Sequence, residues 1–68
     1  MTLKTARLNA QLSQRALAKQ AGVDNSFISR VEAGERSLSS AGYAAVVRIA
    51  AVLGVDPGEL VAEQVVSQ

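Results

Sequence analysis

Residues 14–33, QRALAKQAGVDNSFISRVEA, decide the fold of this 68-residue chain. Leu17, Ala18 and Ala21 recur at the spacing of one helix face. Gly22 follows directly, and a left-handed residue that ends a helix is most often glycine. Ala18 lies four residues before this turn, and its small side chain lets a second helix cross closely. The sequence therefore predicts a helix from Gln14 to about Gln20, with Ser13 as its N-cap.

A second helix is expected from about Asn25 to Ala33, after Asp24, whose side-chain oxygen is expected to cap it. Apolar positions at Val23, Ile28 and Val31 give this helix one buried face. Its other face is polar and carries Asn25, Ser26, Ser29 and Arg30. Two short helices around a glycine turn, the second with an exposed polar face, are the pattern of a helix-turn-helix that offers polar side chains to a DNA groove.

The composition bounds the possible chemistry. The chain is short enough for one domain, 1–68, and it has no cysteine and no histidine. Disulfides, thiolate zinc sites and the commonest general base are thereby excluded. No nucleophile–base pair, metal cluster or glycine-rich phosphate loop is present, so we expect no enzyme, metal, cofactor or small-molecule ligand. Alanine and leucine without strand-like alternation predict an all-α domain.

Charge is distributed unevenly along the chain. Residues 1–36 carry six cationic and three anionic side chains, a net charge of +3, whereas residues 37–68 carry one and three, a net charge of −2. The basic half contains the predicted helix-turn-helix and favours a polyanionic partner, although small domains often have uneven charge. No apolar run approaches about 20 residues and no signal pattern opens the chain, so we expect a cytoplasmic protein without membrane contact.

Three more helices are expected around this unit. The first spans Thr2 to Gln11, is capped by Thr2, and has a rough apolar side made of Leu3, Ala6, Leu8 and Ala10. The fourth is capped by Ser39 or Ser40 and has a wide buried face made of Tyr43, Val46, Val47, Ile49, Ala50 and Leu53. The fifth runs from Pro57 to about Val65 after an Asp56 cap, with Leu60 inward.

Four segments carry a resemblance to a known family: Arg7 in the first helix, SQRALAKQAGV (13–23), FISRVEAG (27–34) and RIAAVLGVDPGEL (48–60). From Arg7 to about residue 60 the chain resembles the Cro and phage-repressor class of helix-turn-helix domains, also called XRE-like. The resemblance implies a compact five-helix, lambda-repressor-like fold. It also implies a transcription regulator of bacteria or phages that binds palindromic, double-stranded operator DNA as a homodimer.

By the same resemblance, Asn25, Ser26 and Arg30 match base-reading positions. Asparagine pairs bidentately with adenine and arginine with guanine, although Arg30 could equally bind phosphate. Ser29 could reach a base, a phosphate or neither. A solvated helix face is the alternative for all four. Phe27, between this face and the core, is expected to pack rather than to contact a thymine methyl group.

Further positions match phosphate contacts or positioning residues. Gln14 matches the family glutamine at the N-terminus of the second helix, where backbone amides and the helix dipole favour a phosphate. By the same match, this side chain contacts a residue of the recognition helix or a base. Its alternative is an exposed first-turn residue. Phosphate contacts are also expected from Ser13, Arg15, Arg36 and Ser37. The stretch from Gly34 to the Ile49-Ala50 pair is expected to be about three residues longer than is usual in such domains, and its connector ERSLSS (35–40) resembles that of restriction–modification controller proteins.

A salt bridge and a dimer interface are the remaining expectations. Arg7 and Glu32 match a salt bridge between the first and third helices, and a free Arg7 bound to phosphate is the alternative. Val61, Val65 and Val66 have little left to cover, so we expect a dimer interface there, with a frayed terminus as the alternative.

The sequence thus favours a nucleoid-associated regulator of the Cro-like or controller type, more often a repressor than an activator. The rival interpretation is an antitoxin or other protein-interaction module of the same fold, with the valines as its docking surface.

Overall fold

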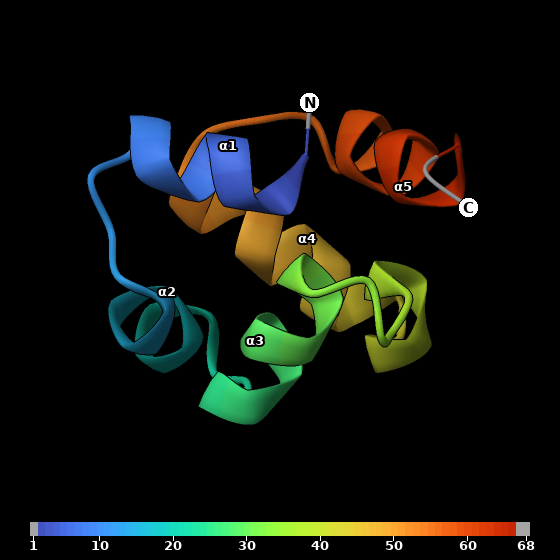
Figure 1. Cartoon of the computed structure of the whole chain (residues 1–68). Coiled ribbons are helices and arrows are strands. Elements are labelled where there is room, and N and C mark those ends of the chain that lie inside the picture. Colours follow the sequence, from blue (N-terminus) through green and yellow to red (C-terminus); the bar gives the residue numbers. More distant parts are fainter. Residues whose placement is uncertain (1, 67–68) are drawn as a thin grey trace.

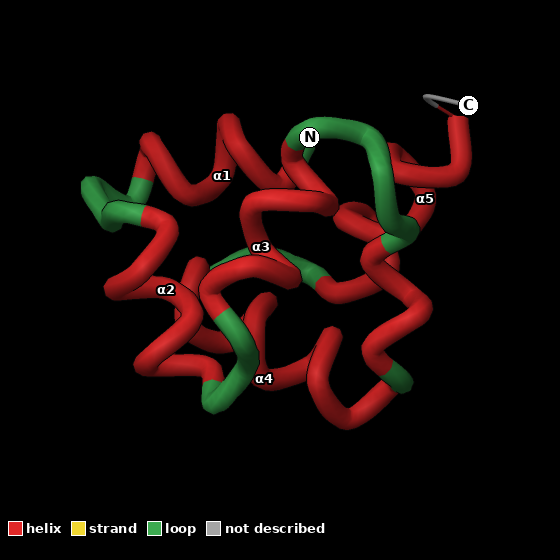
Figure 2. Tube along the Cα trace, turned by 60° about the horizontal axis from the view of Figure 1, so that its bottom comes forward, coloured by secondary structure: helices red, strands yellow, loops and turns green. Residues whose placement is uncertain are grey.

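Five α-helices and one short 3-10 helix make up the structure, a computed structural model that describes the backbone of residues 2–66 and the side chains of residues 2–61 (Figure 1). The elements are α1 (Leu3–Asn9), α2 (Gln14–Ala21), α3 (Asn25–Glu32), η1 (Leu38–Ala41), α4 (Tyr43–Leu53) and α5 (Pro57–Val66). Loops join the helices, and no strand occurs in residues 2–66 (Figure 2). The prediction of an all-α, five-helix domain is confirmed.

The core draws on every element. Each of the six contributes one large aliphatic side chain that is 0% exposed: Leu3, Leu17, Ile28, Leu38, Ile49 and Leu60. Helix α4 packs against α2, η1 and α5, while α2 also packs against α3. Small residues fill the close approaches, since Ala18 and Ala50 are 2% and 1% exposed. With a radius of gyration of 10.2 Å, the chain is as compact as a domain of its length should be.

Helix α1 is shorter than predicted. Thr2 caps it as expected, because its Oγ1 accepts a hydrogen bond of 3.1 Å from the Thr5 N–H. The predicted end at Gln11 is wrong: the helix ends at Asn9, and Gln11 has a positive φ of 61° that turns the chain away. Leu8 was also placed wrongly on the apolar side. Residues 3, 6, 7 and 10 share the inner face at 100° per residue, so Leu8 projects outward and is 55% exposed.

The connector before α4 corrects a second prediction. Ser39 and Ser40 do not cap α4; they lie in η1, which is held to the core by Leu38. The N-cap of α4 is Gly42, whose φ of 91° suits a residue without Cβ. The predicted buried face of α4 is also too wide, since Tyr43 is 79% exposed and Val47 36% exposed.

Helix α5 begins as predicted. The carboxylate Oδ1 of Asp56 accepts a hydrogen bond of 2.8 Å from the Gly58 N–H, and Pro57 is the first helical residue. Leu60 is fully buried, and Val61 is half-buried against the core. Within the described residues, no helix has both the length and the apolarity that crossing a bilayer requires.

Candidate nucleic-acid interface

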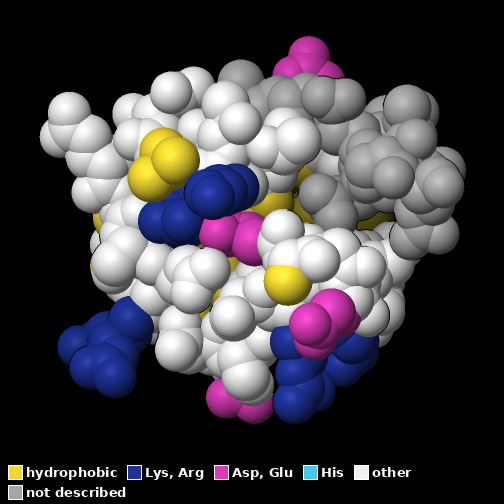
Figure 3. Space-filling view, in the orientation of Figure 1, with side chains coloured by type: hydrophobic (Ala, Val, Ile, Leu, Met, Phe, Trp, Pro, Cys, Tyr) yellow, Lys and Arg dark blue, Asp and Glu magenta, His cyan; other side chains and the backbone are white. Residues whose placement is uncertain are grey.

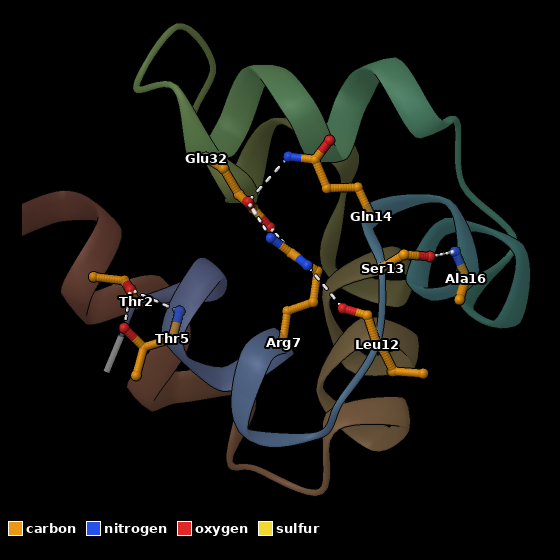
Figure 4. Close-up of polar contacts among 8 residues, drawn as sticks. All are labelled: Thr2, Thr5, Arg7, Leu12, Ser13, Gln14, Ala16 and Glu32. Carbon is orange, nitrogen blue, oxygen red and sulfur yellow. Dashed lines mark hydrogen bonds and ion pairs between the residues drawn. The ribbon is translucent and has the colours of Figure 1, made fainter.

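The turn between α2 and α3 is built from local backbone contacts. Ser13 caps the start of α2, with its Oγ accepting from the Ala16 N–H at 3.0 Å (Figure 4). At the other end, Gly22 adopts φ 71° and ψ 34°, and the Val23 N–H donates to the Ala18 carbonyl at 2.9 Å. The left-handed glycine reverses the chain within two residues. Helix α3 therefore starts close to the end of α2.

Helix α3 starts after Asp24, as predicted, but not for the predicted reason. Asp24 has the extended backbone of an N-cap (φ −70°, ψ 139°), yet its side chain makes no capping hydrogen bond. The prediction of a side-chain cap is wrong. The helix is held instead by the burial of Ile28 and Val31, which are 0% and 2% exposed. Its first turn therefore depends on the turn that precedes it.

The solvent side of α3 carries the predicted base-reading residues. Asn25, Ser26, Ser29 and Arg30 are all exposed, and none makes a side-chain hydrogen bond to another described residue. Phe27 lies half-buried between this face and the core. One amide, two hydroxyls and one guanidinium thus point away from the protein. These groups have the donors and acceptors that match base edges in a major groove.

Arg7 and Glu32 are brought together from α1 and α3 (Figure 4). Arg7 Nε lies 2.6 Å from Glu32 Oε2, and Nη2 donates to Oε1 at 3.0 Å, so the pair is bidentate. The remaining donor, Nη1, bonds the Leu12 carbonyl at 2.7 Å. With Arg7 only 8% exposed and its three donor nitrogens directed inward, a phosphate has little access to it.

Electrostatics keep this pair ionised. Burial acts to raise the pKa of Glu32, but hydrogen bonds from Arg7 and Gln14, together with the charges of Arg7 and Lys4, bring it below its ordinary value. The hydrogen bond to Glu32 raises the pKa of Arg7 despite the opposing effect of burial. At neutral pH both side chains are therefore charged and mutually satisfied.

Gln14 joins the same network from the start of α2. Its Nε2 donates to Glu32 Oε1 at 3.1 Å, and the side chain is half-buried (Figure 4). The expectation of an exposed first-turn residue as the alternative does not hold. Gln14 ties the beginning of α2 to the end of α3, and the next residue, Arg15, is exposed.

Arg36 folds back along α3. Its guanidinium carbon lies 5.6 Å from the centroid of the Phe27 ring, within the range of a cation–π contact, and Nη2 donates to Ser40 Oγ at 3.2 Å. Ser37, half-buried, has its Oγ 2.8 Å from that of Ser39. The connector thus presents an exposed cation, Arg36, beside α3, while the hydroxyls of Ser37, Ser39 and Ser40 bond within the connector.

Arg48 is a contact that sequence reasoning missed. From α4, its Nε donates to the carbonyl of Ala21, the last residue of α2, at 2.9 Å. The one available signal was its isolation as the single cation of residues 37–68. That signal does not identify a partner 27 residues away, because the crossing of α2 and α4 decides which carbonyl it meets.

Basic and acidic side chains lie close together on the face of the molecule that Figure 3 shows. In Figure 3, Lys and Arg side chains form separate groups, and acidic side chains lie beside two of them. On the face shown in Figure 3, the basic side chains therefore do not form one continuous surface. Among the described residues, no group of three acidic or other ligand side chains could hold a metal ion.

The predicted dimer residues lie at the opposite end of the sequence. Val61 is half-buried and borders an open groove of about 500 Å³ between η1, α4 and α5. The groove is lined by Ser39, Tyr43, Val46, Pro57, Gly58 and Val61. Val61 covers core in its own chain, which corrects the expectation that it has little to cover. The side chains of Val65 and Val66 lie outside the described residues.

The chain matches a known protein family over nearly its whole length. Residues 1–64 match the family model described as a helix-turn-helix domain, so the match covers α1–α4 and most of α5. Comparisons with curated proteins and with solved structures gave no match.

Proposed function

Because the chain belongs to the helix-turn-helix domain family, we propose that it is a sequence-specific transcription regulator that binds a palindromic operator as a homodimer. The polar side of α3 carries the proposal. Four side chains that can hydrogen-bond to base edges are exposed on this side of α3, while Ile28 and Val31 on the opposite side are buried in the core. A helix so anchored can enter the major groove without unfolding.

In this proposal α3 is the recognition helix. Asn25 donates to and accepts from adenine, and Arg30 donates both of its terminal groups to guanine. Each such bidentate pair discriminates against a wrong base by about 1–3 kcal/mol. Ser26 and Ser29 add single hydrogen bonds of lower selectivity. Specificity then resides in one turn-and-a-half of helix.

Affinity would come from the phosphate backbone. The N-terminus of α2, where Ser13 and Gln14 stand, offers backbone amides to one phosphate, and Arg15 offers a charge beside it. Arg36 and Ser37 offer a second contact from the connector on the other side of α3. Binding of this kind weakens steeply as salt rises, because each cation releases counterions from the DNA.

A homodimer is proposed through α5 and its surroundings. Tyr43, 79% exposed, stands at the mouth of the groove that Val61 borders, and the sequence continues with Val65 and Val66. Two copies related by a two-fold axis would present their recognition helices about 34–36 Å apart on one face of the duplex. Sedimentation with and without operator DNA tests this step, and a monomer under both conditions at high concentration would contradict it.

Within the family, the resemblance in residues 7–60 favours a Cro-like or controller-type regulator, acting as a repressor on the nucleoid by occupying a promoter. An antitoxin is the second candidate, since the exposed Tyr43 and the adjoining groove could equally seat a toxin. A toxin that co-purifies with the chain and occludes α5 would favour that candidate.

Selection of bound duplexes from a random pool, at a stated salt concentration, is the direct test of the function. The wild-type chain should enrich a palindromic consensus. Asn25→Ala and Arg30→Ala should each relax the preference at a different position of the half-site, while Asn9→Ala, an exposed asparagine of α1, should enrich the wild-type consensus. Enrichment of no consensus by the wild-type chain would contradict the proposal.

A further inference from the structure

The last carbonyl of α2 is held by a side chain from another helix. The final carbonyls of a helix have no partner inside the helix, and here two of them are bonded by the turn itself: Ala18 to the Val23 N–H and Lys19 to the Gly22 N–H. The carbonyl of Ala21 is bonded instead by Nε of Arg48 at 2.9 Å. A cation at this position also meets the negative end of the helix dipole.

The same side chain lies directly against the turn. A Cβ atom built on Gly22 would lie 3.9 Å from Nε of Arg48, so the guanidinium is in van der Waals reach of the left-handed residue, although both residues are exposed. The contact is part-buried and connects elements 27 residues apart in the sequence. Arg48 thus joins the stable α2–α4 packing to the backbone that leads into α3.

Apart from this contact, the start of α3 is held by two half-buried side chains, Val23 and Phe27, that pack against the core. Asp24 makes no side-chain capping bond, and the side chains of Asn25 and Ser26 are exposed. The large buried contacts of α3 begin only at Ile28. The direction of the first turn of α3 therefore depends on the backbone of residues 21–24, in which Arg48 bonds the Ala21 carbonyl.

We propose that Arg48 is a positioning residue: by holding the Ala21 carbonyl it fixes the turn and thereby the placement of Asn25 and Ser26 against base edges. This inference rests on the proposed DNA-binding function. It differs from a phosphate contact in a measurable way, because a positioning residue contributes to discrimination between sequences rather than to general affinity for DNA.

The first experiment compares DNA affinities. Arg48→Met removes the donor and the charge but keeps an unbranched apolar stem. Its affinity for the selected operator should fall by up to about tenfold, because binding must then re-order a turn that the charged hydrogen bond holds in the free wild-type protein. Affinity for an unrelated duplex, and the slope of log K against log salt, should stay at the wild-type values. Arg48→Lys, which keeps a cationic donor, should recover most of the selectivity and serves as the second variant if the methionine variant does not fold.

Two results would overturn the inference. An equal loss for operator and unrelated duplex, with a salt slope smaller by about 0.9, would show a phosphate contact instead. Unchanged operator affinity in Arg48→Met would show that the contact has no bearing on DNA recognition.

The second experiment needs no DNA. Amide hydrogen exchange in the free protein should accelerate at Val23 in Arg48→Met, relative to Leu60, whose N–H bonds to the Asp56 carbonyl in the distant α5. An equal acceleration at both amides, or at neither, would overturn the holding role of Arg48. A wild-type chain that selects no sequence would instead overturn the proposed function, whatever the exchange at Val23 shows.

Discussion

Nε of Arg7 lies 2.6 Å from Oε2 of Glu32, 25 residues later in the sequence. This ion pair joins α1 to the last residue of α3, the recognition-helix candidate. Gln14 adds a bond from the start of α2 to the same carboxylate. Three helices therefore meet at one side chain. The end of α3 is fixed by this network, whereas its start is fixed through the turn that Arg48 contacts. The two ends are held by different means and can be tested separately.

Removal of the Glu32 carboxylate should destabilise the fold. Glu32→Ala leaves the buried Arg7 charge without its anionic partner and with only the Leu12 carbonyl bond, which costs about 3 kcal/mol, the low end for such pairs. For a domain of this size that loss lowers the melting temperature by about 12 °C or more. Glu35→Ala is the matched control, since Glu35 is exposed and should change stability by less than about 0.5 kcal/mol. Equal shifts in thermal denaturation of the two variants would contradict a structural role for the pair.

The same carboxylate predicts how stability depends on pH. The pKa of Glu32 is lower in the folded chain than its ordinary value, so the unfolded chain binds more protons in the interval between the two. Its contribution is complete above the ordinary carboxyl pKa of about 4.3 and is lost as pH falls through the folded pKa. The raised pKa of Arg7 adds nothing here, because that side chain stays protonated throughout the acid range.

Thermal denaturation between pH 7 and pH 3 measures this effect. The wild-type chain should be more stable than Glu32→Gln at pH 7, since glutamine keeps the shape of the side chain without its charge. The difference in melting temperature should shrink as pH falls below the ordinary carboxyl pKa of about 4.3, because residue 32 of the unfolded wild-type chain then binds a proton before the folded chain does. A difference that stays constant down to pH 3 would show that the charge of Glu32 does not stabilise the fold.

Much of the fold could be predicted because its signals are local. The turn at Gly22, the caps at Thr2 and Ser13 and the burial of Ile28 follow from residues a few positions apart. The error at Leu8 was local, because helical spacing puts residues 3, 6, 7 and 10 on one face and leaves Leu8 55% exposed. Tertiary contacts explain why a charged residue can share that face: Arg7 is buried because the Glu32 carboxylate of α3 satisfies its guanidinium.

The candidate site was predictable in the same measure. The polar side of α3 can be read from helical spacing alone, since its apolar side must be buried. Two contacts could not be predicted from the sequence, because both depend on how separate elements cross: the stacking of Arg36 over Phe27 and the hydrogen bond from Arg48 to the Ala21 carbonyl. Which exposed side chains touch bases or phosphates stays a prediction.

Gly22 provides a test of the turn itself. Its φ of 71° is strained for any residue with a Cβ, while the nearest atom to such a Cβ, Nε of Arg48, is 3.9 Å away and gives only ordinary contact. Conformation rather than crowding should therefore dominate, and Gly22→Ala should lower the free energy of unfolding by about 1–2 kcal/mol. Gly22→Asn should cost less, because asparagine tolerates the left-handed region. Chemical denaturation measures both, and a larger loss for asparagine would indicate crowding instead.

The salt dependence of DNA binding separates phosphate contacts from the other cations. Arg15 is exposed beside the N-terminus of α2, so Arg15→Met should weaken binding to operator and unrelated duplex alike and reduce the slope of log K against log salt by about 0.9. Arg36→Met should do the same and should also lower thermal stability slightly, because Arg36 contacts Phe27 and Ser40.

Arg48→Met is the control for both, since its cation is engaged with a protein carbonyl and its slope should equal that of the wild-type chain. Titrations by fluorescence anisotropy at several salt concentrations give all three slopes. Slopes that are unchanged in Arg15→Met and Arg36→Met would place the phosphate backbone away from the start of α2 and from the connector. The orientation proposed for α3 in the groove would then be wrong, because both elements flank it.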